Sequence, residues 1–171
     1  MKRWAEAGDV RYLTFSCHRQ LPLLKHQGIK DVFRDELAER TASDDIRLIA
    51  WVVMHDHVHL ILQPIDDDTI VPLLAQLKRN VARTVLSRWR TLDAPILKKL
   101  ETKTGRTKFW KPGGGYDRVL VNDADIVEKI DYIHANPVEK GYCDFETDWP
   151  WSSARAYAGL PNDGPPIEHA M

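Results

Sequence analysis

Two histidines separated by a single residue, His57 and His59, carry the strongest chemical signal in the chain. The apolar and β-branched residues around them, from position 51 to position 62, predict a strand, and residues i and i+2 of a strand project from the same face. Two adjacent imidazoles suit a divalent metal ion, because an unperturbed histidine pKa of about 6.5 leaves most of the side chain neutral at pH 7. Two ligands do not complete a metal site, so a third polar group is needed.

Tyr132 and Asn136 supply the missing chemistry. They are four residues apart near the end of a predicted helix, so their side chains can lie along one face. An amide oxygen is a hard, neutral ligand, and added to two imidazoles it gives a three-point metal site with positions open for phosphate oxygens and water. A phenol is a poor nucleophile at neutral pH, but a metal ion that polarises the phosphorus compensates for this. The residues therefore predict His57, His59 and Asn136 as metal ligands and Tyr132 as the nucleophile.

Hydrophobic periodicity predicts the elements that must position these residues. Alternating or continuous apolar runs predict strands, and three- and four-residue apolar steps predict helices. Pro137 disfavours the helical conformation at Asn136, so the last helix is expected to end there. Helices separated by antiparallel strand pairs favour an α+β fold with helices packed on a sheet. The expected strands are 10–18, 46–53, 57–63 and 116–121, and the expected helices are 26–40, 70–89 and 124–135.

Length and composition predict a single compact unit. The 171 residues are 43% apolar, which supports one domain over residues 1–158, followed by a loop-like tail over 159–171 that is rich in Pro and Gly. Two cysteines are too few for a disulfide framework or a zinc cluster, so a reducing cytoplasm is expected. The first eleven residues do not resemble a signal peptide, and no segment approaches the roughly 20 apolar residues of a membrane span.

The net charge of −1 hides a strongly basic segment, residues 76–111, with eleven basic and two acidic residues. Trp89, Phe109 and Trp110 are interleaved with these charges, a combination that a phosphate backbone and unstacked bases would favour. The alternative is a solvated helix and loop whose charges serve solubility. The predicted DNA contacts are Lys78, Arg79, Arg83, Lys103, Arg106, Lys108 and Lys111, the last four in a loop expected to be mobile.

Four motifs together resemble a known family. VVMHDHVHLIL, FWKPGGGYDRVL, DYIHANPVEKG and WPWSSARAYAG occur in this order over roughly residues 10–158. They resemble the REP-associated tyrosine transposases, within the larger group of HUH single-strand DNA endonucleases. HUH denotes His-hydrophobic-His, which falls here on His57 and His59. The family's nucleophile falls on Tyr132, and the polar metal ligand one turn later falls on Asn136.

The resemblance implies a ferredoxin-like antiparallel sheet, a Mg²⁺ or Mn²⁺ ion and cleavage of single-stranded DNA near a REP-like hairpin. Tyr132 would attack the scissile phosphate, form a 5′-phosphotyrosine and release a 3′-hydroxyl. Because the energy of the broken bond is retained in the covalent intermediate, rejoining would need no ATP. A cytoplasmic, nucleoid-associated protein is expected, and both a monomer and a homodimer remain open.

The chain departs from the family pattern at two places. His55 and Asp56 precede the metal histidines where the family usually has Pro and Asn, and residues 113–115 are glycines where bulkier residues are common. We interpret His55 as a turn residue. The glycines are expected to alter DNA contacts.

Three alternatives stay open at this stage. Tyr116, which follows the glycines, is a rival nucleophile. The run from His55 to His59 superficially resembles the signature of histidine-triad nucleotide hydrolases, which wants a hydrophobic residue where Asp56 stands. The third alternative is a domesticated protein that binds REP-like hairpins without cutting them. Trp149 and Trp151 are expected to pack the C-terminal segment onto the core.

Overall fold

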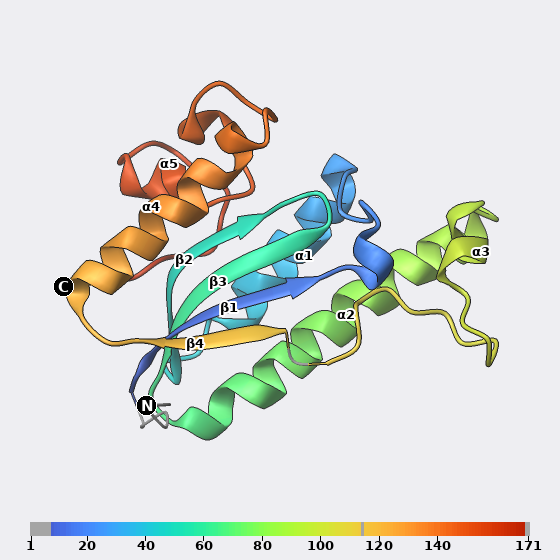
Figure 1. The fold of residues 1–171 in the computed structure, drawn as a ribbon, viewed down its shortest axis with the longest axis horizontal. Helices are drawn as coiled ribbons and strands as arrows, with labels where there is room; N and C mark the ends of the chain where they lie inside the picture. Colours follow the sequence, from blue (N-terminus) through green and yellow to red (C-terminus); the bar gives the residue numbers. More distant parts are fainter. Residues whose placement is uncertain (1–7, 114, 170–171) are drawn as a thin grey trace.

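The computed structural model describes residues 8–113 and 115–169 and has an antiparallel sheet of four strands in the order β2-β3-β1-β4 (Figure 1). The expected α+β fold is confirmed. The strands are β1 (Val10–Ser16), β2 (Ile46–Val53), β3 (His57–Pro64) and β4 (Tyr116–Leu120). The helices are α1 (Gln27–Arg40), α2 (Ile70–Thr91), α3 (Ile96–Leu100), α4 (Asp123–Glu139) and α5 (Ala154–Tyr157), with single 3₁₀ turns η1 (His18–Gln20), η2 (Asp67–Thr69) and η3 (Glu146–Asp148).

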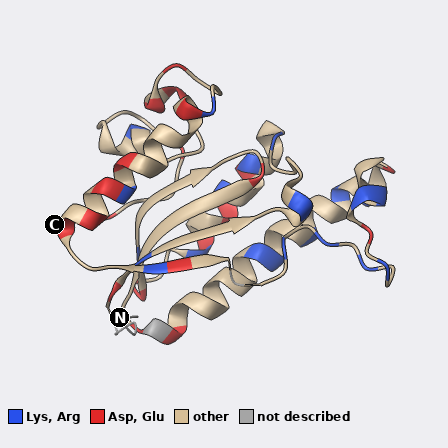
Figure 2. Ribbon diagram, in the orientation of Figure 1, with Lys and Arg blue, Asp and Glu red and all other residues tan. Residues whose placement is uncertain are grey.

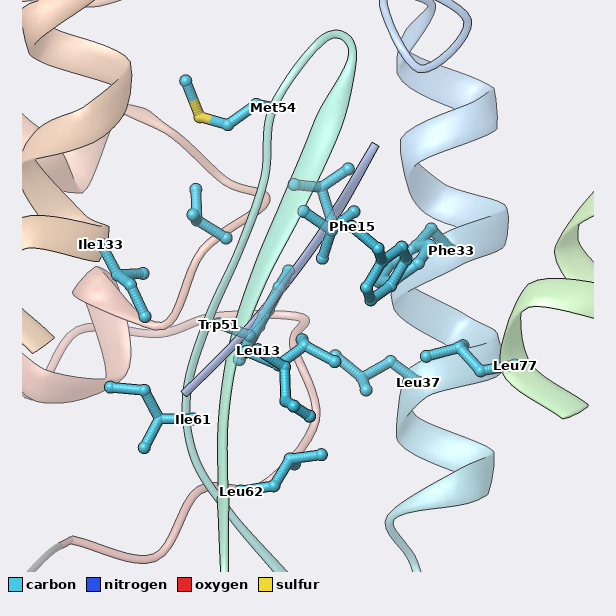
Figure 3. Close-up of a cluster of buried hydrophobic side chains, with 14 of the residues drawn as sticks. Leu13, Phe15, Phe33, Leu37, Trp51, Met54, Ile61, Leu62, Leu77 and Ile133 are labelled. Atoms are coloured by element: carbon cyan, nitrogen blue, oxygen red, sulfur yellow. The ribbon is translucent and has the colours of Figure 1, made fainter. Parts of the chain in front are cut away.

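One face of the sheet forms the main core. Leu13 and Phe15 of β1 point to this face, opposite Leu60 and Val58 of β3. Helices α1 and α2 cover it, and Figure 3 shows Phe33 of α1 directed at the side chains of the strands. These residues are buried, as the apolar alternation of the strands requires.

Helix α4 lies on the opposite side of the sheet from α1. Figure 3 shows Ile133 of α4 on one side of the strands and Phe33 and Leu37 of α1 on the other. Its strand contacts are with β2 and, to a lesser extent, with β4. Asn122 caps the N-terminus of α4, and its side chain accepts a hydrogen bond from the backbone N–H of Asp125 at 2.9 Å. Figure 1 shows α4 along the β2 side of this face, with no helix lying across β1 or the start of β4 there.

The predicted end of the last helix is wrong. Helix α4 continues through Pro137 to Glu139. A proline removes one backbone donor and disfavours a helical conformation in the preceding residue, but it does not forbid one. Here Asn136 and Pro137 are both buried, and the carbonyl oxygen of Asn136 accepts a hydrogen bond from the N–H of Lys140 at 3.0 Å. Tertiary packing and this last turn therefore hold the helix together past the proline.

Two of the three aromatic residues of the basic segment are not available to bases. Phe109 and Trp110 are buried in the core, and the indole N–H of Trp110 donates to the carbonyl oxygen of Lys78 at 2.8 Å. Trp89 is half-buried and packs against Phe109. The interpretation of Phe109 and Trp110 as base-stacking groups was therefore wrong, since hydrophobic burial explains these two rings.

The C-terminal segment covers the outer edge of β2. The N–H of Val53 donates to the carbonyl oxygen of Trp151, and the N–H of Glu168 donates to that of Leu48. Trp149 and Trp151 are buried, as expected from the sequence. The part of the tail within residues 159–169 has no helix or strand. Among the described residues, no helix has the length and apolar character needed to cross a membrane.

Candidate metal and nucleophile site

The two histidines lie at the start of β3, on the face of the sheet that α4 only partly covers. His59 pairs with Thr14 of β1, and His57 pairs with Ser16. Their ring centroids are 4.8 Å apart with the planes 82° apart. The strand therefore presents both imidazoles together, as the His-x-His spacing predicts.

Each histidine uses Nδ1 for a hydrogen bond within the protein. Nδ1 of His57 lies 2.7 Å from a carboxylate oxygen of Asp56. Nδ1 of His59 lies 2.8 Å from the hydroxyl of Tyr12 and 2.8 Å from that of Thr14. Partners of this kind fix the tautomer and ring orientation of metal-binding histidines, because a protonated Nδ1 leaves the lone pair on Nε2.

His59 is only 4% exposed, and in the part of the chain that the structure describes its Nε2 has no hydrogen-bond partner. A buried polar nitrogen without a partner is costly, so such an atom needs an explanation. Burial, and then the neighbouring His57, lower the pKa of His59 to about 3. The imidazole is therefore neutral at pH 7, which is the state that binds metal.

Tyr132 of α4 lies against His59. The ring centroids are 5.7 Å apart and the planes are 74° apart. Tyr132 is 43% exposed, so its ring contacts the histidine while part of the side chain remains open to solvent. The structure thus places the predicted nucleophile beside a predicted ligand that is distant in the sequence.

Asn136 lies one turn further along α4 and is buried. Its side-chain nitrogen donates to the backbone oxygen of Tyr132 at 3.3 Å, which leaves the amide oxygen as the group that can bind a metal. Among residues 8–113 and 115–169, no group of three or more His, Cys, Asp or Glu side chains is placed to hold a metal ion. A centre at the histidine pair would therefore take its third protein ligand from another residue type.

Two of the other sequence candidates, Tyr116 and His55, have different surroundings. Tyr116 is 54% exposed and contacts Tyr12 with ring centroids 5.9 Å apart, so it reaches the histidines only through another ring. His55 lies in the connection between β2 and β3 and stacks on Tyr142 with centroids 3.9 Å apart. The interpretation of His55 as a turn residue is confirmed, and no histidine triad forms.

The predicted DNA contacts divide into two groups. Lys78 is half-buried: its ammonium lies 5.1 Å from the centroid of the Phe15 ring, and it donates to the carbonyl oxygen of Gly113 at 3.4 Å. The other six side chains are exposed, and Figure 2 shows basic residues along α2 and in the loop that follows α3. The exposed members are Arg79, Arg83, Lys103, Arg106, Lys108 and Lys111.

One contribution to the site was missed from the sequence. Tyr12 and Thr14 alternate on β1 as an ordinary strand would, and their hydroxyls hold His59. The sequence did contain a signal for these two residues. Tyr12 and Thr14 are polar side chains at alternate positions of a central strand, and such positions indicate a sheet face with polar partners.

Comparison with known proteins agrees with this arrangement. The model of the family described as "Transposase IS200 like" matches residues 12–136, so the chain belongs to this transposase family. The match includes both histidines, Tyr132 and Asn136.

The relatives specify the resemblance further. The chain is similar to the REP-associated tyrosine transposase of Escherichia coli K12, with 31% identity over 136 residues, which is 78% of this chain and 64% of the relative. A Haemophilus influenzae Rd protein provisionally named a REP-associated tyrosine transposase is 29% identical over 122 residues, or 71% of this chain and 66% of that protein. The chain thus spans slightly less than two thirds of each relative.

The fold matches that of a solved transposase. The structure described as a REP-associated tyrosine transposase bound to a REP hairpin superimposes with a TM-score of 0.69. The alignment covers 100% of this chain and 93% of the other, at 19% sequence identity. The expected fold class is therefore confirmed.

Proposed function

We propose that this chain is a metal-dependent single-strand DNA endonuclease and strand transferase that acts beside REP-like hairpins through a 5′-phosphotyrosine. The observation that carries the proposal is the contact between Tyr132 and His59, whose Nε2 is buried without a partner among the described residues. A nucleophile next to an unused metal-ligand atom is an arrangement suited to metal-assisted phosphoryl transfer.

In this proposal His57, His59 and Asn136 would hold a Mg²⁺ or Mn²⁺ ion, and their hydrogen bonds support that role. Both imidazoles have Nδ1 engaged by protein groups, and the amide nitrogen of Asn136 is also engaged, so three ligand atoms remain. A bound ion would supply Lewis acidity to the scissile phosphate and hold it in place. The neutral state of His59 supports this role, because protonation would compete with metal binding.

In the proposed reaction the phenol oxygen of Tyr132 forms a bond to phosphorus, and the bond between phosphorus and the 3′-oxygen breaks. The phenol proton passes to solvent, and the departing 3′-oxygen takes up a proton. The reverse reaction with a 3′-hydroxyl on another end rejoins DNA, since the phosphodiester energy is held in the phosphotyrosine. The 43% exposure of Tyr132 supports this role, because it leaves part of the side chain accessible to a DNA strand.

The test is covalent capture of a labelled hairpin oligonucleotide with single-stranded flanks, chosen from palindromes that flank the encoding gene. Wild-type protein should form an adduct in Mg²⁺ or Mn²⁺ that survives denaturing electrophoresis. Tyr132→Phe should form none while binding the hairpin almost as tightly, and Tyr142→Phe, a tyrosine stacked on His55, serves as the matched control.

Retention of the adduct by Tyr132→Phe would contradict the assignment. Loss of the adduct in Tyr116→Phe with retention in Tyr132→Phe would move the nucleophile to Tyr116. Hairpin binding by wild-type protein with no adduct in either metal would favour the domesticated binder.

A further inference from the structure

The half of the sheet without a helix carries a row of polar and aromatic side chains that we call the open strip. It comprises Tyr12 and Thr14 of β1 with their partners Arg118 and Tyr116 of β4. Directly paired residues of antiparallel strands point to the same face, and Thr14 also pairs with His59. The open strip is therefore continuous with the candidate metal site.

Tyr116 is the aromatic group of the open strip that is most available to a ligand. It is more than half exposed, and its edge-on contact with Tyr12 leaves ring surface free. Tyr12 in turn stacks on His59 with centroids 5.7 Å apart and planes 13° apart. The exposed ring is thus one side chain away from a predicted metal ligand.

The backbone before Tyr116 is fixed by Gly115. This residue has φ +82°, and a Cβ at this position would lie 2.2 Å from the carbonyl oxygen of Thr14. Only glycine allows this close approach, because it has no Cβ and adopts positive φ without strain. One of the three glycines that depart from the family pattern thus holds the start of β4 against β1 and sets the position of Tyr116.

Two cations border the open strip. Arg118 is exposed and lies opposite Tyr12. Lys129 of α4 has its ammonium 5.5 Å from the centroid of the Tyr132 ring, one turn before the proposed nucleophile. Its other partner, the carboxylate of Glu128, is largely exposed, and an ion pair of this kind is weak enough to yield to a phosphate.

A neighbouring carboxylate does not oppose an anion here. Asp117 follows Tyr116 on β4 and pairs with Leu13, so it projects to the opposite face of the sheet. There it forms an ion pair with Arg11, with Nε donating to a carboxylate oxygen at 2.9 Å. The face of β4 next to the histidines is therefore cationic and aromatic.

The open strip differs from the basic segment in what it can bind. The exposed cations of the basic segment lie on α2 and in the loop after α3 (Figure 2), and the aromatic residues among them are buried or half-buried. Charges without exposed rings suit the phosphates of a duplex, whereas charges beside an exposed ring suit a single strand. The two surfaces therefore favour different parts of one DNA molecule.

We propose that the single strand next to the scissile phosphate crosses the open strip between α4 and β4, with one base stacked on Tyr116 and flanking phosphates held by Arg118 and Lys129. This inference rests on the proposed function for its substrate class. It assigns Tyr116 to DNA binding, in place of the nucleophilic role that the sequence left open.

The experiment measures binding and not cleavage, so it does not require an active enzyme. A fluorescent oligo(dT) of 20 nucleotides is titrated with the Tyr132→Phe protein at several salt concentrations. Adding Tyr116→Ala should weaken binding about 5- to 100-fold, as loss of one base–aromatic stack does. Adding Tyr116→Phe should restore most of the affinity, because the ring remains.

The cation variants test the phosphate contacts. Arg118→Gln and Lys129→Gln should each weaken binding and reduce the slope of log K against log salt by about 0.7, the value for one phosphate on a single strand. Phe145→Ala and Lys140→Gln are controls, since they remove an exposed ring and an exposed cation outside the open strip. Both controls should bind within about twofold of the parent protein.

Normal oligo(dT) binding by Tyr116→Ala, or no binding by the parent protein, would overturn the inference. An equal loss in the Phe145→Ala control would do the same. The proposed function has a different test: it is contradicted if wild-type protein binds hairpin DNA but forms no adduct. In that case the binding result for the open strip is unaffected.

Discussion

The two faces of the sheet are formed by the same strands but differ in what covers them and in which side chains they carry. On β1, Leu13 and Phe15 enter the core under α1 and α2, whereas Tyr12 and Thr14 face the histidines. The first face is covered by two helices, whereas on the second face α4 lies along the β2 side and has fewer contacts with β4. The comparison teaches that the candidate site arises where the second helix layer is incomplete.

The less covered face is not uniformly exposed to solvent. His59 is nearly inaccessible because Tyr12, Thr14 and Tyr132 surround it, while Tyr132 itself remains partly open. This combination strengthens electrostatic interactions at the histidine and leaves access for a ligand at the tyrosine. One face therefore provides stability and the other provides a protected but reachable centre.

Truncation of a core-face residue should give the largest effect on stability and none on chemistry. Leu60→Ala removes a fully buried side chain and should lower the free energy of unfolding by about 2–5 kcal/mol. Urea unfolding followed by circular dichroism measures this loss. Val127→Ala, an exposed position on α4, should change it by less than about 0.5 kcal/mol. Loss of adduct formation in the folded Leu60→Ala protein would contradict the assignment of stability to one face and chemistry to the other.

The substitution His57→Ala should reduce metal binding and adduct formation but leave stability almost unchanged. Because His57 is a proposed direct metal ligand, Mn²⁺ affinity and the rate of adduct formation should each fall more than about 100-fold, beyond the loss typical of a residue that only orients a ligand. Its ring is on the less covered face, so the melting temperature should hardly change. Isothermal titration with Mn²⁺ and a thermal melt check both parts, and unchanged metal binding would remove His57 from the site.

Low pH should reduce the free energy of unfolding through His134, which lies in the covered part of the second face. Burial lowers the pKa of His134 to about 4, and its Nε2 lies 2.8 Å from the Ser153 hydroxyl. Between pH 4 and about 6.5 the unfolded chain binds a proton that the folded chain does not, so stability is full above pH 6.5 and falls with decreasing pH. The loss should reach at most about 3 kcal/mol. Urea unfolding at pH 7.5 and 4.5 should show a smaller difference in His134→Gln, and an equal difference would refute this role.

The smallest expected effect is that of Asp56→Asn. The amide can still accept a hydrogen bond from Nδ1 of His57, but the negative charge behind the ligand is lost. Mn²⁺ affinity should fall about tenfold, with Asp56→Ala falling further, as titration calorimetry would show. An unchanged affinity in Asp56→Ala would mean that His57 needs no orienting partner.

The strands and the site pairing could be predicted from the sequence because both depend on short periods. The expected strand over 46–53 has the observed bounds, and 57–63 is one residue short. The i, i+2 and i, i+4 spacings place His57 with His59 and Tyr132 with Asn136 once the elements are known. The contact between the pairs is tertiary and could be expected only from the family resemblance.

The errors came from reading local signals where tertiary packing decides. Pro137 has a local preference against helix that burial overcame. Phe109 and Trp110 lie in a segment without regular structure, which made their rings look exposed, yet they fill the core below Phe15. The hydroxyl partners of His59 lie on another strand, and strand register is not visible in spacing alone.

The central position of β1 has a consequence for when the site can form. This strand is made first but pairs with β3 and β4, which are far along the chain. Contacts so distant in sequence close late in folding, because the entropy of a long loop must be overcome before they form. A growing chain that has reached only β3 holds its histidine pair without Tyr132 and Asn136. The proposed cleavage of DNA thus depends on completion of α4, and a product truncated before α4 would carry two of the three proposed metal ligands and lack the proposed nucleophile.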